Sequence, residues 1–354
     1  MKILQVCPRY YPDIGGVEEH VRNISERLAK KYDVTIFTTD PSGKLPREEV
    51  INDVKIRRFK SWAPNEAYYF SRELKKCLMK NSDSFDIVHA HSYHAFPALY
   101  AMQAKRRNKF IFTPHYHGAG HTLFRSLLHI LYKPVAEKIF EKADRIICVS
   151  KYEKNLVIRN FKVREEKIVV IPNGINPEEF RRLKRKNDGK VVLYVGRLEK
   201  YKGVDYLIKV LPRLDEDIRL EIIRKGPYKW KLLKLIDELR VANRVKFYQD
   251  LPRNELLQKY TTASVFVMLS KYEAFNISTM EALASGTPCI VANTSALSEW
   301  IDNKMCFGIN YLINETKLAE LIMDVIKTRK NVLNRYLKLL SWDEVVDKIV
   351  QLYA

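Results

Sequence analysis

The sequence predicts an α/β protein with two domains, each built on a doubly wound parallel sheet. Three observations lead to this prediction. Short apolar runs alternate with helix-like segments along the chain, and consecutive positions within the runs are apolar, as in strands buried on both faces. The alternation stops at a polar, basic segment that ends near Lys190, and then it restarts. A chain of 354 residues is long enough for two such cores.

The first domain is predicted to span residues 1–174. Its candidate strands are residues 3–7, 34–38, 54–59, 87–90, 110–113, 146–149 and 168–171. The turn Pro172-Asn173-Gly174 ends the last of these strands, and the residues after it have neither helical nor strand periodicity. We therefore place the domain boundary there.

The second domain is predicted to span residues 175–340. Its candidate strands are residues 191–195, 219–223, 245–248, 263–269 and 289–292, with helical segments such as 204–211 and 230–239 between them. Residues 341–354 contain an amphipathic helix with a strongly apolar face. We expect this last helix to pack back on the first domain.

Composition excludes several classes of protein. With 46% hydrophobic and 29% charged residues, the chain is neither fibrous nor disordered. No apolar run reaches 18 residues and the first residues do not resemble a signal peptide, so we expect a cytosolic protein that does not span a membrane. The five scattered cysteines contain no C-x-x-C pair, which argues against a disulfide framework or a structural zinc site.

The chain is strongly basic, with a formal net charge of +20. This charge predicts attraction to phosphate groups, whether on nucleotides, anionic lipids or nucleic acid, and does not choose among them. The basic residues are spread over several clusters. Solvated surface is an alternative interpretation of each cluster.

Two glutamates, Glu273 and Glu281, mark the most informative stretch. Glu273 falls in the turn after an apolar run, and Glu281 falls inside the helix that follows. The helix start between them, near Asn276 and Ile277, offers backbone N–H groups to a diphosphate. The carboxylates can accept hydrogen bonds from sugar and ribose hydroxyls. The order of groups matches a nucleotide sugar, although both glutamates could simply favour the helix dipole and solubility.

Two cations, Arg197 and Lys202, lie in the segment GRLEKYKG between a buried strand and a helix. Cations at the carboxyl end of a parallel strand fit the oxygens of a diphosphate, which gains negative charge as it leaves. The next strand-to-helix turn adds Arg224 and Lys225 near the same edge. Solvated loop cations are the alternative.

The first strand leads into the pair Gly15-Gly16 before a predicted helix. Glycines at the carboxyl edge of a sheet let the backbone come close to a ligand. A lone pair of glycines is weak evidence, because the G-x-G-x-x-G pattern is missing and a tight turn without a ligand explains it equally well.

Six of the eight histidines fall between His89 and His121, which suggests a metal site at first sight. His89 and His91, like His115 and His117, form i, i+2 pairs without a nearby aspartate or cysteine to complete a set, so we predict no metal. His115 instead follows a strand and could donate a hydrogen bond to a substrate hydroxyl or phosphate. The D-x-D motif at 215–217 precedes a strand and lies at the wrong edge for catalysis, so we interpret it as a solvated turn.

Taken together, these motifs resemble the retaining glycosyltransferases of family 4, over essentially the whole chain. The resemblance rests on Glu273-x7-Glu281, GRLxxxKG, Gly15-Gly16 and Pro172-Asn173-Gly174-Ile175, in the family's order and spacing. It implies the GT-B fold, in which two Rossmann-like domains face each other across a cleft. The first domain would then lie on the acceptor side and the second would bind the nucleotide sugar.

The resemblance also implies roles for the site residues. Arg197 and Lys202 would hold the donor diphosphate, Glu281 the ribose and Glu273 the transferred sugar. Gly16 would approach the phosphates, and His115 the sugar or leaving group. Transfer would retain the anomeric configuration without a metal or a separate cofactor. We expect a UDP- or GDP-sugar as donor and a glycan or lipid-linked acceptor, with no nucleic-acid partner.

The chain departs from the family pattern in two turns. Asn276 stands where the family commonly has glycine, a mild change because asparagine tolerates the left-handed conformation. Arg224 and Lys225 stand where the family has a glycine-containing G-x-G-P turn. The second change places two large cations beside the expected base pocket.

Two other function classes remain open. One is a sugar-nucleotide epimerase or phosphorylase-like enzyme of the same fold. An epimerase, unlike a glycosyltransferase, would release nucleotide or a changed sugar without any acceptor. A noncatalytic basic protein would bind lipid or nucleic acid in a salt-dependent way. Substitution of Glu273 or Glu281 would not affect that binding.

Residues 122–140 suggest a membrane contact. Leucines, Phe124 and Ile130 supply an apolar face, while Arg125, Lys133 and Lys138 supply cations, as in helices that lie among lipid headgroups. A core-facing domain helix is the alternative. Together with the net charge of the chain, the segment predicts that the protein acts at the cytosolic face of an anionic membrane.

Overall fold

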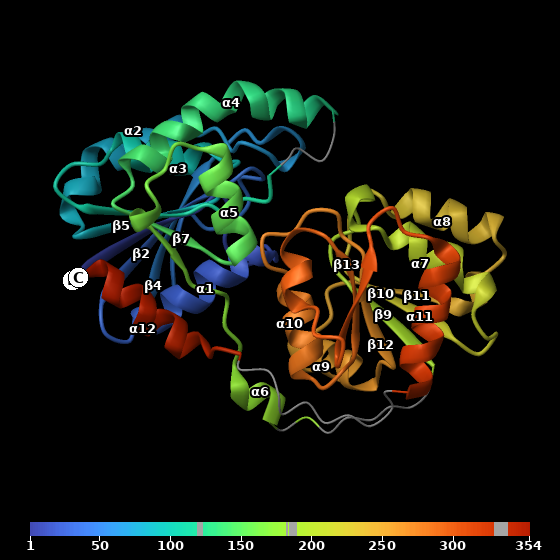
Figure 1. Ribbon diagram of the computed structural model, residues 1–354. Coiled ribbons are helices and arrows are strands. Elements are labelled where there is room, and N and C mark those ends of the chain that lie inside the picture. Colours follow the sequence, from blue (N-terminus) through green and yellow to red (C-terminus); the bar gives the residue numbers. More distant parts are fainter. Residues whose placement is uncertain (119–122, 182, 184–189, 329–338) are drawn as a thin grey trace. The chain divides into compact units, whose positions relative to one another are not determined.

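A computed structural model gives the fold of the chain. It describes every residue except 119–122, 182, 184–189 and 329–338, and it describes the backbone alone at residues 65 and 123–128. The chain divides into two compact units (Figure 1). The first comprises Met1–Gly174 and Leu340–Ala354, and the second comprises Ile175–Leu339.

The first unit is built on one sheet with helices on both faces (Figure 1). Its strands are β1 (Lys2–Val6), β2 (Asp33–Asp40), β3 (Glu48–Ile51), β4 (Val54–Lys60), β5 (Ile87–His91), β6 (Lys109–Thr113), β7 (Arg145–Cys148) and β8 (Ile168–Val170). Its α-helices are α1 (Gly16–Leu28), α2 (Arg72–Asn81), α3 (Phe96–Gln103), α4 (Leu123–Lys142), α5 (Lys151–Asn160) and α12 (Trp342–Tyr353).

The strand order of this sheet is β3-β4-β2-β1-β5-β6-β7-β8, and all neighbours are parallel except β3 and β4. Leu4 of β1 joins a core with buried residues of α2, α3, α4 and α5. Its neighbour Ile3 joins a second core with residues of α1 and α12. Because alternate strand residues point to opposite faces, helices on both sides bury consecutive residues. This double burial explains the apolar runs in the sequence.

Helix α12 returns the end of the chain to the first unit. Ser341 caps it in a reciprocal capping box with Glu344. At its far end the Tyr353 hydroxyl lies 2.8 Å from Nδ1 of buried His89 on β5. Gly174 passes so close to the start of α12 that a Cβ there would lie 2.6 Å from the backbone nitrogen of Trp342. The glycine therefore permits the close passage of these two chain segments.

The second unit has its own sheet and core. Its strands are β9 (Val191–Val195), β10 (Arg219–Ile223), β11 (Val245–Tyr248), β12 (Val265–Met268), β13 (Cys289–Asn293) and β14 (Cys306–Asn310). Its α-helices are α6 (Pro177–Arg181), α7 (Val204–Val210), α8 (Lys229–Glu238), α9 (Arg253–Thr262), α10 (Ile277–Ala284) and α11 (Glu315–Thr328).

All strands of the second sheet are parallel, in the order β11-β10-β9-β12-β13-β14. The chain runs outward from β9 through β10 to β11, and then crosses to the other side of β9 to form β12. The strand order therefore reverses between β9 and β12. Open α/β sheets bind ligands outside the carboxyl ends of the strands at such a reversal.

The α/β fold class predicted from the sequence is confirmed, with two parallel-sheet units. The sequence prediction missed two strands, β3 and β14. Both lie at sheet edges and are only partly buried, so they lack a continuous apolar run. No helix in the described part of the chain is long and apolar enough to cross a membrane.

Candidate active site

The reversal point of the second sheet brings together two loops that the sequence singled out. The loop after β9 carries Lys202, and the loop after the neighbouring β12 carries Glu273. Their side chains form an ion pair with Nζ 2.5 Å from Oε1, and they are only 13% and 12% exposed. Burial alone would lower the pKa of Lys202. Glu273 and two nearby tyrosines raise this pKa by more than burial lowers it, so the pKa lies above its ordinary value. Lys202 therefore remains a cation inside the site.

Arg197 lies in the same loop as Lys202 but does not join its ion pair. Its Nε lies 3.2 Å from the carboxylate of Glu199, and its side chain is 40% exposed. Gly203 ends the loop with φ of 70°, and a Cβ there would lie 2.6 Å from the carbonyl oxygen of Leu269. Only glycine meets both demands at low cost. The glycine after Lys202 thus lets this loop pack against the end of β12.

Helix α10 begins between the two glutamates, as predicted. Its N-cap, Asn276, has φ of 76°, so the asparagine adopts the left-handed conformation that the sequence suggested. The Asn276 side chain accepts a 2.8 Å hydrogen bond from the backbone nitrogen of Thr279. Ile277 is the first helical residue. The first N–H groups of a helix have no partner within the helix, so they suit an anion.

Glu281 is held in place by two residues that the sequence interpretation missed. Glu281 is 8% exposed, and its Oε1 lies 2.5 Å from the guanidinium of Arg253. The Tyr260 hydroxyl donates to Oε2 over 3.1 Å. Arg253 also contacts Glu179 of α6 over 2.7 Å. These contacts orient the Glu281 carboxylate.

Arg253 and Tyr260 lie on α9, the helix before β12, and carry no motif of their own. Their contacts with Glu281 arise only when α9 packs beside α10. Ser295 was also missed: its hydroxyl accepts a 3.2 Å hydrogen bond from the backbone nitrogen of Glu273. Nothing in the local sequence identifies these partners.

In the first unit, Gly15 and Gly16 lie where the loop after β1 enters α1. Gly15 is the N-cap residue with extended backbone, and Gly16 begins the helix. A Cβ at Gly15 would meet the Glu18 carboxylate at 2.3 Å, whereas a Cβ at Gly16 would meet no described atom within 4 Å. The atom nearest to a Cβ at Gly15 is the end of a flexible side chain, so packing against the described chain requires a glycine at neither position.

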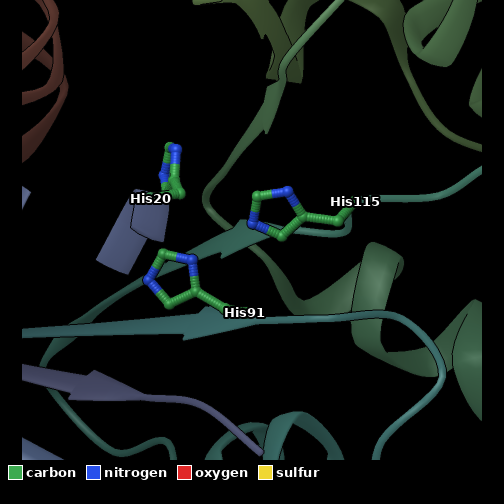
Figure 2. A group of neighbouring side chains, drawn as sticks. All are labelled: His20, His91 and His115. Carbon is green, nitrogen blue, oxygen red and sulfur yellow. The ribbon is translucent and has the colours of Figure 1, made fainter. Parts of the chain in front are cut away.

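His115 follows β6 in the loop that the sequence predicted, with φ of 49°. Burial lowers the pKa of its imidazole well below the ordinary value, so the ring is neutral at pH 7. The loop is fixed by Glu153 of α5, which accepts from the backbone nitrogens of Tyr116 and Val149. Glu153 was missed, although Ser150-x-x-Glu153 has the capping-box spacing and was visible in the sequence. The ring of His115 lies beside His20 and His91 (Figure 2).

Two family models match the chain almost end to end. The model described as Glycosyltransferase Family 4 matches residues 14–179, and the one described as Glycosyl transferases group 1 matches residues 175–337. An uncharacterised glycosyltransferase of Methanocaldococcus jannaschii is 30% identical over 366 residues, covering 97% of this chain and 95% of the relative. The chain belongs to the family 4 glycosyltransferases.

Two further proteins resemble this glycosyltransferase. The phosphatidylinositol N-acetylglucosaminyltransferase GPI3 subunit of Saccharomyces cerevisiae is 22% identical over 99% of this chain and 82% of the relative. The crystal structure of Anabaena HepE in complex with UDP and glucose superposes with a TM-score of 0.79, at 17% identity and 99% coverage of both chains. At that identity the structural likeness shows the fold, which is GT-B.

The turn after β10 is where this glycosyltransferase departs from the predicted family pattern. Arg224 has φ of 106°, a conformation that glycine adopts more easily. A Cβ at Gly226 would lie 2.3 Å from the carbonyl oxygen of Leu198, so that glycine is required by packing. The turn keeps one glycine where it touches the Arg197 loop and places a strained arginine beside it. Placing Arg224 where the family has a glycine-containing turn therefore costs local backbone strain.

The D-x-D motif of the glycosyltransferase lies apart from this edge of the sheet. Residues 215–217 are exposed and directly precede β10, at the amino end of the strands. Asp217 pairs with Lys190, which precedes β9. The placement agrees with the interpretation of a solvated turn.

Proposed function

We propose that this glycosyltransferase moves a sugar from a UDP- or GDP-sugar to a glycan or lipid-linked acceptor with retention of anomeric configuration. The observation that carries the proposal is the buried pair of Lys202 and Glu273 at the strand reversal, beside the start of α10. Glu273, the helix N-terminus with Lys202, and Glu281 stand in the order of a donor's sugar, diphosphate and ribose groups.

Lys202 and Arg197 bind the donor diphosphate in this proposal. An ammonium has three donors, and the pair with Glu273 uses one of them. Lys202 can therefore bind a phosphate oxygen while Glu273 still orients it. Both cations stabilise the charge that forms on the diphosphate as the bond to the anomeric carbon breaks.

The carboxylates position the rest of the donor. Glu273 accepts from hydroxyls of the transferred sugar, and Glu281, fixed by Arg253 and Tyr260, accepts from the ribose. The family resemblance further assigns the phosphates to Gly15 and Gly16 of the first unit and the sugar or leaving group to His115. These assignments extend the family resemblance to the positions that match it.

Transfer proceeds without a metal at the diphosphate. The acceptor oxygen bonds to the anomeric carbon on the face that the phosphate leaves, and the departing phosphate oxygen takes the acceptor proton. The cations supply the positive charge that a Mg²⁺ or Mn²⁺ ion would otherwise provide. No separate cofactor takes part.

A lipid-linked acceptor at an anionic membrane surface is supported by exposed apolar residues of α4. Ile130 and Leu131 are 65% and 67% exposed, so these two residues do not belong to the core. Tyr132 and Ile139 form its buried face. The side chains of residues 122–128 lie outside the described residues. The yeast relative named above, a phosphatidylinositol glycosyltransferase by its name, gives further support.

The direct test is acceptor dependence. We expect the protein, incubated with a UDP- or GDP-sugar, to release nucleotide only when a glycan or lipid-linked acceptor is present, also in EDTA. NMR of the product should show the donor's anomeric configuration. Release of a changed sugar without acceptor would identify an epimerase instead. Loss of activity in EDTA that Mg²⁺ or Mn²⁺ restores would contradict the metal-free step.

A further inference from the structure

Three histidines from separate segments meet at the strand reversal of the first sheet. His20 lies on α1, His91 ends β5, and His115 follows the neighbouring β6. Figure 2 shows their rings gathered around one space. One possible ligand nitrogen from each ring lies within 4.8 Å of those of the other two. The sequence interpretation considered only histidines close together in the chain, so it did not include His20.

Within the described part of the chain, each of the three rings has a buried nitrogen without a hydrogen-bond partner. These atoms are Nε2 of His20, Nδ1 of His91 and Nε2 of His115. Leaving a buried polar atom unpaired costs about 1–3 kcal/mol. His89, two residues before His91, has both nitrogens paired, with Tyr353 and Thr113 over 2.8 Å each. A buried histidine of the same strand can therefore have both ring nitrogens paired.

The opposite nitrogens of two rings are fixed by amide oxygens. His20 Nδ1 lies 2.6 Å from Oδ1 of Asn173, and His91 Nε2 lies 2.7 Å from Oε1 of Gln5. An amide oxygen can only accept a hydrogen bond, so each of these nitrogens carries the proton. The lone pair then lies on the unpaired nitrogen of the same ring. Metal-binding histidines characteristically have such a second partner, which fixes the tautomer.

The dimensions of the trio suit a tetrahedral ion. Nitrogen ligands of a tetrahedral zinc lie at about 2.0–2.1 Å from the ion and hence about 3.3 Å from one another. The possible ligand nitrogens of the trio lie within 4.8 Å of one another, so each would move inward by about 1 Å to bind the ion. The ring centroids are 5.5 Å apart for His20 and His91, 5.0 Å for His20 and His115, and 5.9 Å for His91 and His115. Small ring movements would close the site around an ion.

We propose that His20, His91 and His115 bind a divalent transition metal, with Zn²⁺ as the preferred ion. Neutral imidazole ligands favour zinc, cobalt or nickel over Mg²⁺ or Mn²⁺. Three protein ligands leave the fourth tetrahedral position to water or to an oxygen of a ligand. The inference does not rest on the proposed sugar transfer. A bound metal would occupy His115 Nε2, so the metal's open position would replace that nitrogen in any contact with substrate.

The test is metal binding by the full chain without a histidine tag. After removal of metal, Zn²⁺ binding is measured by calorimetry, and Co²⁺ binding by the visible absorption of a tetrahedral site. We expect one ion per chain. We expect H91N and H115N to weaken binding at least a hundredfold. H115N is suited to its position, because asparagine tolerates the positive φ found there.

His89→Asn is the matched control, since it removes an equally buried histidine of the same strand. It should leave metal affinity within about threefold, and circular dichroism reports whether each variant folds. N173A should weaken binding by about 10–100-fold through the lost outer partner. Absence of stoichiometric binding to wild type overturns the proposal, and so does equal binding by wild type, H91N and H115N.

Discussion

The side chains of Lys202 and Glu273 are paired and largely shielded from water at a sheet edge suited to ligands. Replacing Lys202 or Arg197 with alanine is predicted to lower turnover about a hundredfold or more, since a preorganised donor to the forming charge is lost. Steady-state kinetics with the preferred donor measures this change.

The control for these variants is K259A. Lys259 pairs with Glu221 over 2.9 Å, and both side chains are mostly buried in the same unit. K259A breaks a comparable ion pair on other elements, so it should lower stability and keep turnover within about threefold. Near wild-type turnover in both R197A and K202A would refute the assignment.

Arg253 acts through Glu281 and is a positioning residue. We predict that R253Q raises the KM for the donor about tenfold with a smaller change in kcat, because losing a charged hydrogen bond of about 1.4 kcal/mol leaves Glu281 poorly oriented. Arg244, which donates to the backbone oxygens of Ile218 and Asp215, provides the control R244Q. An unchanged donor KM in R253Q would show that Glu281 needs no such support.

Among the elements, α10 begins at a residue with two structural roles. Asn276 both adopts a left-handed backbone and caps the helix. N276A should lower the free energy of unfolding by about 2 kcal/mol, with about 1 kcal/mol from the lost cap and a similar amount from the backbone strain. N276G loses the cap but relieves the strain, so thermal or urea unfolding should place it between N276A and wild type. Equal stability of the two variants would mean that the left-handed backbone carries no cost.

The strands of both sheets could be predicted because helices cover both of their faces. Runs such as Val191–Val195 are apolar at every position and match the strand in the structure. The edge strands β3 and β14 lack this signal. Within the site, Glu273, Glu281, Arg197 and Lys202 were predicted because each lies in a motif next to a strand end.

The partners of these residues could not be predicted. Arg253, Tyr260 and Ser295 reach the site only through the packing of elements distant in sequence. The same limit applies to His20, which lies beside His91 and His115 only because α1 packs next to the ends of β5 and β6. Chain order gives the residues at strand ends, while side-chain contacts depend on tertiary packing.

For the whole molecule, the net charge of +20 and the exposed apolar residues of α4 predict membrane binding. We expect the protein to co-sediment with anionic vesicles more than with neutral ones at physiological salt, because basic residues add about 1 kcal/mol each near an anionic surface. The double variant I130S/L131S should reduce this binding severalfold. L312S, which removes an exposed leucine of the second unit, should not. Failure to bind either vesicle, with full activity on a soluble acceptor, would limit the role of the charge to nucleotide binding and solubility.

The central claim is that the edge formed by β9, β12 and α10 binds the diphosphate of a nucleotide sugar. Calorimetric titration with UDP- and GDP-sugars tests it most directly. Wild type should bind one of these donors, R197A and K202A should each bind it at least tenfold more weakly, and K259A should bind it as wild type does. Wild type that binds neither donor, or R197A and K202A that bind it with unchanged affinity, would contradict the claim.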